Sequence, residues 1–97
     1  MKTYDEVIIT YKNLSDESKI RLKIRGKYEY EVIPVPVEIS VTCGIAHRIK
    51  SKNMQDIVKI IKEFIIRNEI DVYGVHFYWV VDENNYEQFS VDWGLYE

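Results

Sequence analysis

The sequence predicts an α+β fold with a single antiparallel sheet, the element order β-β-β-α-β-β, and one helix packed on one face of the sheet. Two observations predict this class. Isoleucine and valine together number 25, against 4 for leucine and alanine, and β-branched side chains favour strands over helices. Apolar and polar residues alternate in several segments, as in a half-buried strand, whereas residues 53–69 have apolar residues at helical spacing.

The length and composition predict a single domain, residues 1–97. Hydrophobic residues make up 46% of the chain and the net charge is −3, which is typical of a globular protein. The single cysteine, Cys43, excludes an internal disulfide, and the first residues, MKTYDEV, lack the basic and apolar pattern of a signal peptide. No apolar run approaches the roughly 20 residues of a membrane helix. We therefore expect a soluble protein in a reducing, cytoplasmic setting.

The first half of the chain is expected to supply three strands. Apolar residues alternate with polar ones in residues 7–11, in residues 19–32 and in residues 35–43. The sequence NLSDES supplies a turn after the first segment, and the prolines of IPVP mark a strand end or an edge. These segments predict a three-stranded antiparallel meander. Cys43 has the inward-facing parity in the third strand and is interpreted as a small buried hydrophobe.

The helix is predicted over residues 53–69. Asn53 or Ser51 is a candidate N-cap, and Asp56 lies in the first turn, where the helix dipole favours a negative charge. Ile66 points away from the apolar stripe and is expected to be exposed. The stripe itself consists of Met54, Ile57, Val58, Ile61, Phe64 and Ile65.

Residues 76–93, HFYWVVDENNYEQFSVDW, predict a C-terminal hairpin rich in aromatic residues. If ENN forms a three-residue loop, Asp82 faces Tyr86 and Trp79 faces Phe89. One face of the hairpin is then apolar and belongs to the core. This match selects the register, because a slip of one residue would exchange the two faces.

Charge is distributed unevenly along the chain. All 13 basic residues lie at or before Arg67, whereas residues 68–97 carry 7 acidic residues, no basic residue and 8 of the 13 aromatic residues. Such asymmetry bears on partners rather than on fold. Tyrosine beside carboxylates is a composition that protein interfaces use. The partner-binding surface is expected to consist of Tyr78, Asp82, Glu83, Tyr86, Glu87, Asp92 and Tyr96.

The leading functional hypothesis is a small cytoplasmic inhibitor that occludes a basic protein partner, such as a nuclease or another nucleic-acid-processing enzyme. Toxin-immunity proteins and phage anti-defence proteins, including anti-CRISPR-like proteins, act in this way as classes. The alternative interpretation of the acidic hairpin is that an edge strand needs charges to remain soluble. No family motif in the sequence decides between the two.

The second functional hypothesis is a nucleic-acid-binding module that uses the basic face of residues 19–32. Alternate residues of a strand repeat about every 6.6 Å, and this spacing resembles that of successive phosphates. Single-strand binders interleave aromatic residues with the basic ones, and this face has none. Direct binding of nucleic acid is therefore the alternative hypothesis. Its basic row consists of Lys19, Arg21, Lys23, Arg25 and Lys27.

The sequence contains no pattern that predicts catalysis, a metal site or a cofactor. His47 and His76 are the only histidines, and with one cysteine they give no zinc-ligand spacing. His76 is expected to face Asp92 across the hairpin, but a flat sheet face offers no catalytic pocket. We therefore expect a binding protein rather than an enzyme.

Overall fold

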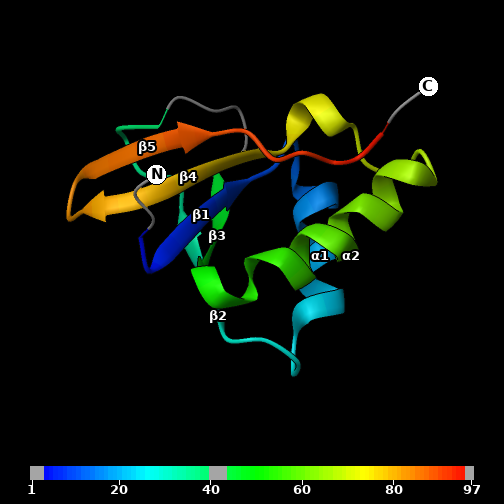
Figure 1. The fold of residues 1–97 in the computed structure, drawn as a ribbon, viewed down its shortest axis with the longest axis horizontal. Coiled ribbons are helices and arrows are strands. Elements are labelled where there is room, and N and C mark those ends of the chain that lie inside the picture. The colour runs from blue at the N-terminus through cyan, green and yellow to red at the C-terminus, as the bar shows by residue number, and fades with distance from the viewer. Residues whose placement is uncertain (1–3, 40–43, 96–97) are drawn as a thin grey trace.

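The computed structural model describes residues 4–39 and 44–95 and has an α+β fold built on one antiparallel sheet (Figure 1). The predicted class is confirmed, but the chain has two helices and the order β-α-β-β-α-β-β. Short 3-10 helices precede α2 and β4. The elements are β1 (Glu6–Thr10), α1 (Leu14–Ile24), β2 (Tyr30–Pro34), β3 (Ile45–Lys50), α2 (Met54–Ile66), β4 (His76–Asp82) and β5 (Asn85–Phe89).

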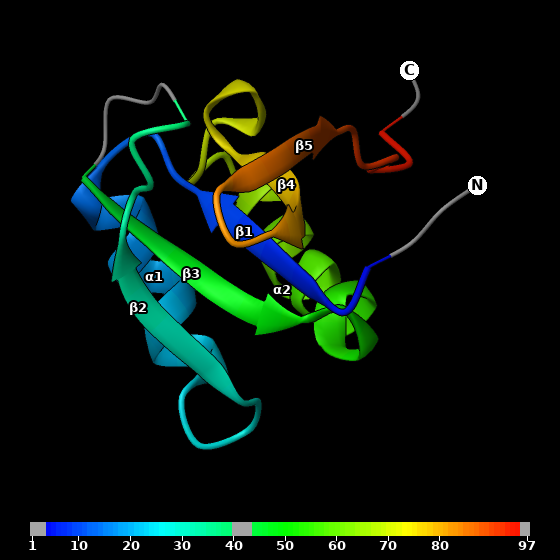
Figure 2. The same cartoon turned by 90° about the vertical axis from the view of Figure 1, so that its left-hand side faces the viewer.

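The sheet has the strand order β2-β3-β1-β4-β5, so that β1 is central and β2 and β5 are the edges. All neighbouring strands are antiparallel. Both helices lie on the same face of the sheet, with α1 behind β2 and β3 and α2 behind β1 and β4 in Figure 2. The arrangement therefore has one layer of helices and one layer of strands.

The main core lies between the helices and the sheet. Successive residues of a strand point to opposite faces, so Val7 and Ile9 of β1 face the helices while Ile8 faces away. All three are fully buried, which shows that both faces of the central strand are covered. The helices contribute Ile20 and Ile24 from α1 and Ile57, Ile61 and Phe64 from α2.

The prediction of a strand at residues 19–32 is wrong for its first half, which belongs to α1. The side chain of Asn13 caps this helix by accepting a hydrogen bond from the backbone N–H of Asp16 at 2.9 Å. Ile20 and Ile24, one helical turn apart, are buried, whereas Leu22 is 64% exposed. The helix ends before Gly26, whose φ of 80° suits a residue without a side chain.

The strand predicted at residues 35–43 is also wrong where the structure describes it. Residues 35–39 form a turn-containing segment that follows β2, and Ile39 packs with Ile8, Ala46 and Tyr78 on the sheet face opposite the helices. Pro34 and Pro36 explain the strand's end, because proline cannot donate a ladder hydrogen bond. This segment gives the second sheet face a small core of its own.

The predicted helix is confirmed as α2, which ends three residues earlier than predicted, and its buried residues, Ile57, Ile61 and Phe64, belong to the predicted stripe. Ile66 is 63% exposed, as expected. The capping prediction is wrong, because Asn53 makes no side-chain capping hydrogen bond and a 3-10 turn, Ser51–Asn53, precedes the helix. Asn68 ends the helix with a φ of 60°. Within the described residues, neither helix is long and apolar enough to cross a membrane.

The predicted hairpin is formed by β4 and β5, but its register is shifted by two residues. Phe77 pairs with Phe89, and Trp79 pairs with Glu87, whereas Trp79 was expected to face Phe89. The turn is shorter than predicted, and an irregularity between Val80 and Asp82 absorbs the difference. A shift of two preserves the faces, so Phe77 and Trp79 still point into the main core.

Candidate functional site

A chain of hydrogen-bonded polar side chains runs through the core between the sheet and α1. The hydroxyl of Tyr11 lies 2.8 Å from Nδ1 of His47, and Nε2 of His47 lies 2.7 Å from Oε2 of Glu17. The guanidinium of Arg21 donates to the same carboxylate oxygen through Nε at 2.8 Å. Tyr11, His47 and Glu17 are at most 2% exposed, and the partly exposed Arg21 connects them with the surface.

We assign His47 as a neutral imidazole from its partners and its burial. Because a carboxylate only accepts, the Nε2–H of His47 donates to Glu17, and in the neutral imidazole Nδ1 then accepts from the Tyr11 hydroxyl. Burial lowers the pKa of His47, although the hydrogen bond and charge of Glu17 act in the other direction. Burial, together with the charge of Glu17, raises the pKa of Tyr11 well above its ordinary value. With both ring nitrogens occupied, His47 anchors β3 to α1 and is not poised as a catalytic base.

None of the sequence patterns predicted this chain. His47 was noted only as one of two histidines, and Glu17 fell inside the predicted turn. Two features could have revealed it. Asn13 before Asp16 is an N-cap pattern, and Glu17 with Arg21 is an i,i+4 ion pair of a helix.

The connection between β2 and β3 leads directly into β3, the strand that carries His47. The N–H of Val35 donates to the carbonyl of Gly44 at 3.1 Å, which ties the two ends of the connection together. Ile39 is 6% exposed and anchors the connection on the sheet, while Val37 is 94% exposed. The prediction that Cys43 is a buried hydrophobe falls outside the described residues.

The acidic hairpin surface is only partly where it was predicted. Tyr78 is 9% exposed and packs in the second core, so its expected exposure is wrong. Burial also raises its pKa. The exposed carboxylates are those of Asp82, Glu83, Glu87 and Asp92, Tyr86 is half-buried, and Tyr96 falls outside the described residues.

The expected pairing of His76 with Asp92 is not supported by the strand register. Phe77 pairs with Phe89, and Nδ1 of His76 lies 3.4 Å from Nε2 of Gln88. Asp92 lies beyond the end of β5, where its Oδ1 accepts from the N–H of Gly94 at 2.9 Å. The slip of two residues accounts for the difference.

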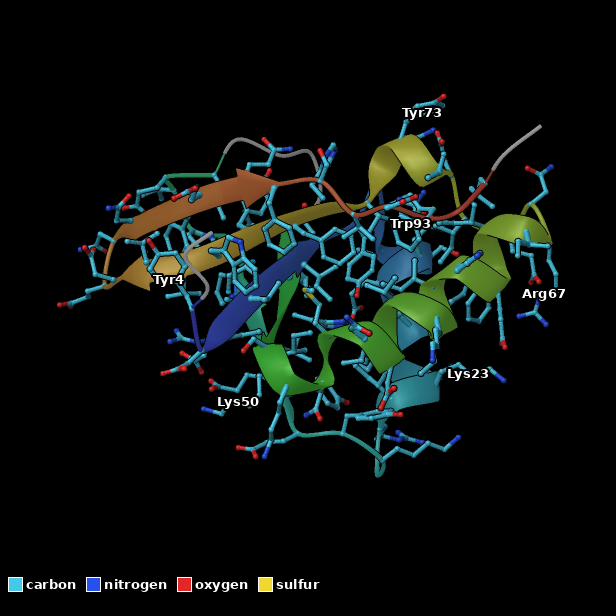
Figure 3. All side chains as sticks on the ribbon, viewed as in Figure 1. Tyr4, Lys23, Lys50, Arg67, Tyr73 and Trp93 are labelled. Carbon is cyan, nitrogen blue, oxygen red and sulfur yellow. The ribbon has the colours of Figure 1, made fainter. Side chains whose placement is uncertain are left out.

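A hollow of about 570 Å³ lies beside the tip of the hairpin. Its wall includes Glu6, which is held by Arg48 and, at 3.3 Å, by Lys50. The hydrogen bond from Arg48 lowers the pKa of Glu6 despite its partial burial. Figure 3 places Tyr4 beside the hairpin and Lys50 below it. Among residues 4–39 and 44–95, no group of three or more histidines and carboxylates could hold a metal ion.

The five basic residues predicted to lie in a row on one face of a strand do not form such a row in the structure. Its first three members lie on α1, where residues two apart point in different directions because each residue turns the helix by about 100°. Arg21 pairs with the buried Glu17, and Lys19 donates to the carbonyl of Glu69 at 2.7 Å. The spacing argument for tracking phosphates therefore fails for Lys19, Arg21, Lys23, Arg25 and Lys27.

The fold and the buried polar chain define a small α+β domain with two helices on one face of its sheet. The chain belongs to the family described as "Putative Se/S carrier protein-like", whose model matches residues 6–76. The match begins with β1 and ends at the first residue of β4, so it includes Cys43 and the buried chain and excludes most of the acidic hairpin. No curated protein and no solved structure matches the chain.

Proposed function

We propose that this protein is a carrier that holds a sulfur or selenium atom on the thiol of Cys43. Membership in a family described as carrier-like for these elements is the observation that carries the proposal. A carrier of this kind needs a thiolate, and Cys43 is the single cysteine of the chain and lies inside the matched residues. The proposed role is transport of an atom between proteins rather than catalysis, and it requires a reducing compartment such as the cytoplasm.

The loading step is an exchange that leaves the overall oxidation state unchanged. The Cys43 thiolate attacks the terminal sulfur of a persulfide on a donor thiol, the donor thiolate leaves, and the sulfur remains on Cys43 as a persulfide. A donor selenopersulfide delivers selenium in the same way. Attack by an acceptor thiolate on the carried atom regenerates the Cys43 thiolate.

The described residues on either side of Cys43 are held on the sheet. The hydrogen bond between Val35 and Gly44 and the burial of Ile39 fix the connection on the sheet. A side chain placed on Gly44 would meet no described atom within 4 Å.

The test is loading of the purified protein with inorganic polysulfide. Intact-mass spectrometry should show the addition of a sulfur atom to the wild-type chain, and cyanide should release that atom as thiocyanate. Cys43→Ser should gain no sulfur. A matched control carries Ser15→Cys in the Cys43→Ser background, because Ser15 is exposed on α1 and supplies a cysteine outside the β2–β3 connection.

The comparison between the two single-cysteine proteins decides the proposal. A carrier should pass its sulfur to a small acceptor thiol from Cys43 while protecting the persulfide from spontaneous loss better than the Ser15→Cys control does. Equal loading, equal lifetime and equal transfer in both proteins would show ordinary thiol reactivity and contradict the carrier role.

A second proposal keeps the inhibitor hypothesis for the hairpin tip. Asp82, Glu83 and Glu87 are exposed around the β4–β5 turn and, within the described part of the chain, make no ion pair. Such a surface suits a basic protein, for example a nucleic-acid-processing enzyme, because complementary charge accelerates association. The tip also lies outside the residues that match the carrier family.

A pull-down from host lysate tests this second proposal. The triple variant Asp82→Asn/Glu83→Gln/Glu87→Gln should lose a basic partner that the wild-type chain retains, and raising the salt concentration should weaken the complex. Asp71→Asn, a change in an exposed carboxylate away from the tip, is the control. Retention of the partner by the triple variant would exclude this surface.

A further inference from the structure

A groove lies between α2 and the segment that follows β5. Its volume is about 650 Å³, which falls within the range of about 300–1,000 Å³ for small-molecule sites. It is separate from the hairpin tip and from the β2–β3 connection. The residues that line it on the sheet side are Trp79, Phe89, Ser90, Val91, Asp92 and Trp93, and those on the helix side are Met54, Gln55, Val58, Lys59 and Lys62.

The sheet side of the groove is an aromatic surface. The rings of Trp79 and Phe89 are stacked, with centroids 4.4 Å apart and an interplanar angle of 17°. Trp93 packs against Phe77 at 5.8 Å, and Figure 3 shows it pointing from the C-terminal segment toward α2. Phe89 and Trp93 are only half-buried, so part of each ring remains exposed to a flat apolar group.

The helix side of the groove supplies positive charge. Lys59 and Lys62 lie three residues apart on one side of α2, and neither has a carboxylate within 4.0 Å among the described residues. Asp92 is the lining carboxylate, and its Oδ1 already accepts the N–H of Gly94. The groove therefore has a positive wall in a chain whose net charge is −3.

We propose that this groove binds a small planar aromatic anion. The flat body of such a ligand would cover the rings of Phe89 and Trp93, and its carboxylate, sulfonate or phosphate would face Lys59 and Lys62. A neutral aromatic molecule would make no charge-assisted contact with the two ammonium groups, and a cation would be repelled by them. This inference is independent of the carrier function and adds a ligand site that the family description does not include.

The test is a titration of the intact protein with 8-anilinonaphthalene-1-sulfonate, a planar aromatic anion. Trp79 and Trp93 are the two tryptophans of the chain and both line the groove, so intrinsic fluorescence reports on the site directly. We expect saturable quenching with one site for each chain. The near-ultraviolet circular dichroism of the protein, recorded before the dye is added, should show fixed aromatic packing, which separates a native site from a partly unfolded state that also binds this dye.

Two comparisons test the charge argument. The double variant Lys59→Gln/Lys62→Gln should weaken binding of the anion on the order of tenfold, as loss of charge-assisted contacts predicts. Lys23→Gln/Lys52→Gln removes two exposed lysines outside the groove and should leave binding unchanged. N-phenyl-1-naphthylamine has the same rings without the sulfonate and should bind both double variants with equal, weaker affinity.

Several results would overturn the proposal. They are the absence of saturable binding to the native protein, an equal loss of affinity in the two double variants, and equal affinity of the wild-type chain for the neutral and the anionic probe. Each result would remove either the site or the role of its two lysines.

Discussion

Removing one oxygen atom from the core tests whether the buried polar chain stabilises the fold. In Tyr11→Phe the aromatic ring remains, but Nδ1 of His47 loses its hydrogen-bond donor. His47 is 0% exposed, so water cannot replace the donor without a rearrangement. An unsatisfied buried acceptor costs about 1–3 kcal/mol. This is a large share of the roughly 5–15 kcal/mol that stabilises an ordinary domain.

The assay is urea denaturation at pH 7.5, followed by far-ultraviolet circular dichroism. The midpoint should fall while the slope with urea stays constant, since the exposed area is unchanged. For a domain of this size the melting temperature should fall by about 4–8 °C for each kcal/mol lost. Tyr73→Phe is the matched control, because Tyr73 is 86% exposed and such surface changes cost less than about 0.5 kcal/mol.

The result that would refute the reasoning is a Tyr11→Phe protein as stable as Tyr73→Phe. It would mean that His47 finds another donor or adopts its other tautomer without cost. The neutral, fully bonded imidazole described above would then be wrong.

Three further predictions follow from the described contacts. Burial lowers the pKa of His47 below its ordinary 6.5, so its contribution to stability is fully present above pH 6.5 and is lost as the pH falls through the folded-state pKa. The urea midpoint should therefore decrease between pH 7.5 and pH 5, and a midpoint that does not change with pH would contradict this prediction. Asn13→Ala should cost about 1 kcal/mol in thermal unfolding, whereas Asn53→Ala, which removes no side-chain cap, should cost less. Ile8→Ala should cost about 2–5 kcal/mol because Ile8 is fully buried; the same loss in Val32→Ala, at a 47% exposed edge position, would contradict the second core.

The sequence predicted best those elements whose spacing of apolar residues fits only one kind of secondary structure. The stripe of α2 repeats at helical spacing over more than three turns, and no strand buries the same set of residues. The apolar alternation of β1 likewise matched a strand, although its central position buries Ile8 as well as Val7 and Ile9. A strand that is covered on both faces has no solvent-exposed side, so its apolar residues need not alternate with polar ones.

The helix α1 was mispredicted because its sequence satisfies two periods. Ile20, Leu22 and Ile24 alternate with charged residues, as in a strand, but Ile20 and Ile24 also lie one helical turn apart. The helix buries those two and exposes Leu22. The cap at Asn13 decides between the interpretations, because it satisfies a backbone donor that only a helix start leaves free.

The burial of Tyr78 depends on a contact that no local pattern contains. The β4–β5 register slipped by two residues and kept the faces, so the expected outer side of β4 is where the sequence placed it. That side is covered because Ile39, nearly forty positions earlier in the chain, folds back over it. The alternation of apolar and polar residues along a strand assigns each residue to a face of the sheet, but it does not show whether a distant segment covers that face.

The groove and the described residues of the β2–β3 connection lie on opposite faces of the sheet. The anchored ends of the β2–β3 connection lie with Ile39 on the face opposite the helices, whereas the aromatic groove opens beside α2 on the helix face. The sheet therefore separates the groove from Val35 and Ile39, which are described residues of the β2–β3 connection. The anionic probe should therefore leave persulfide formation at Cys43 unchanged, and Cys43→Ser should leave probe binding unchanged. Each proposal can consequently fail without deciding the other.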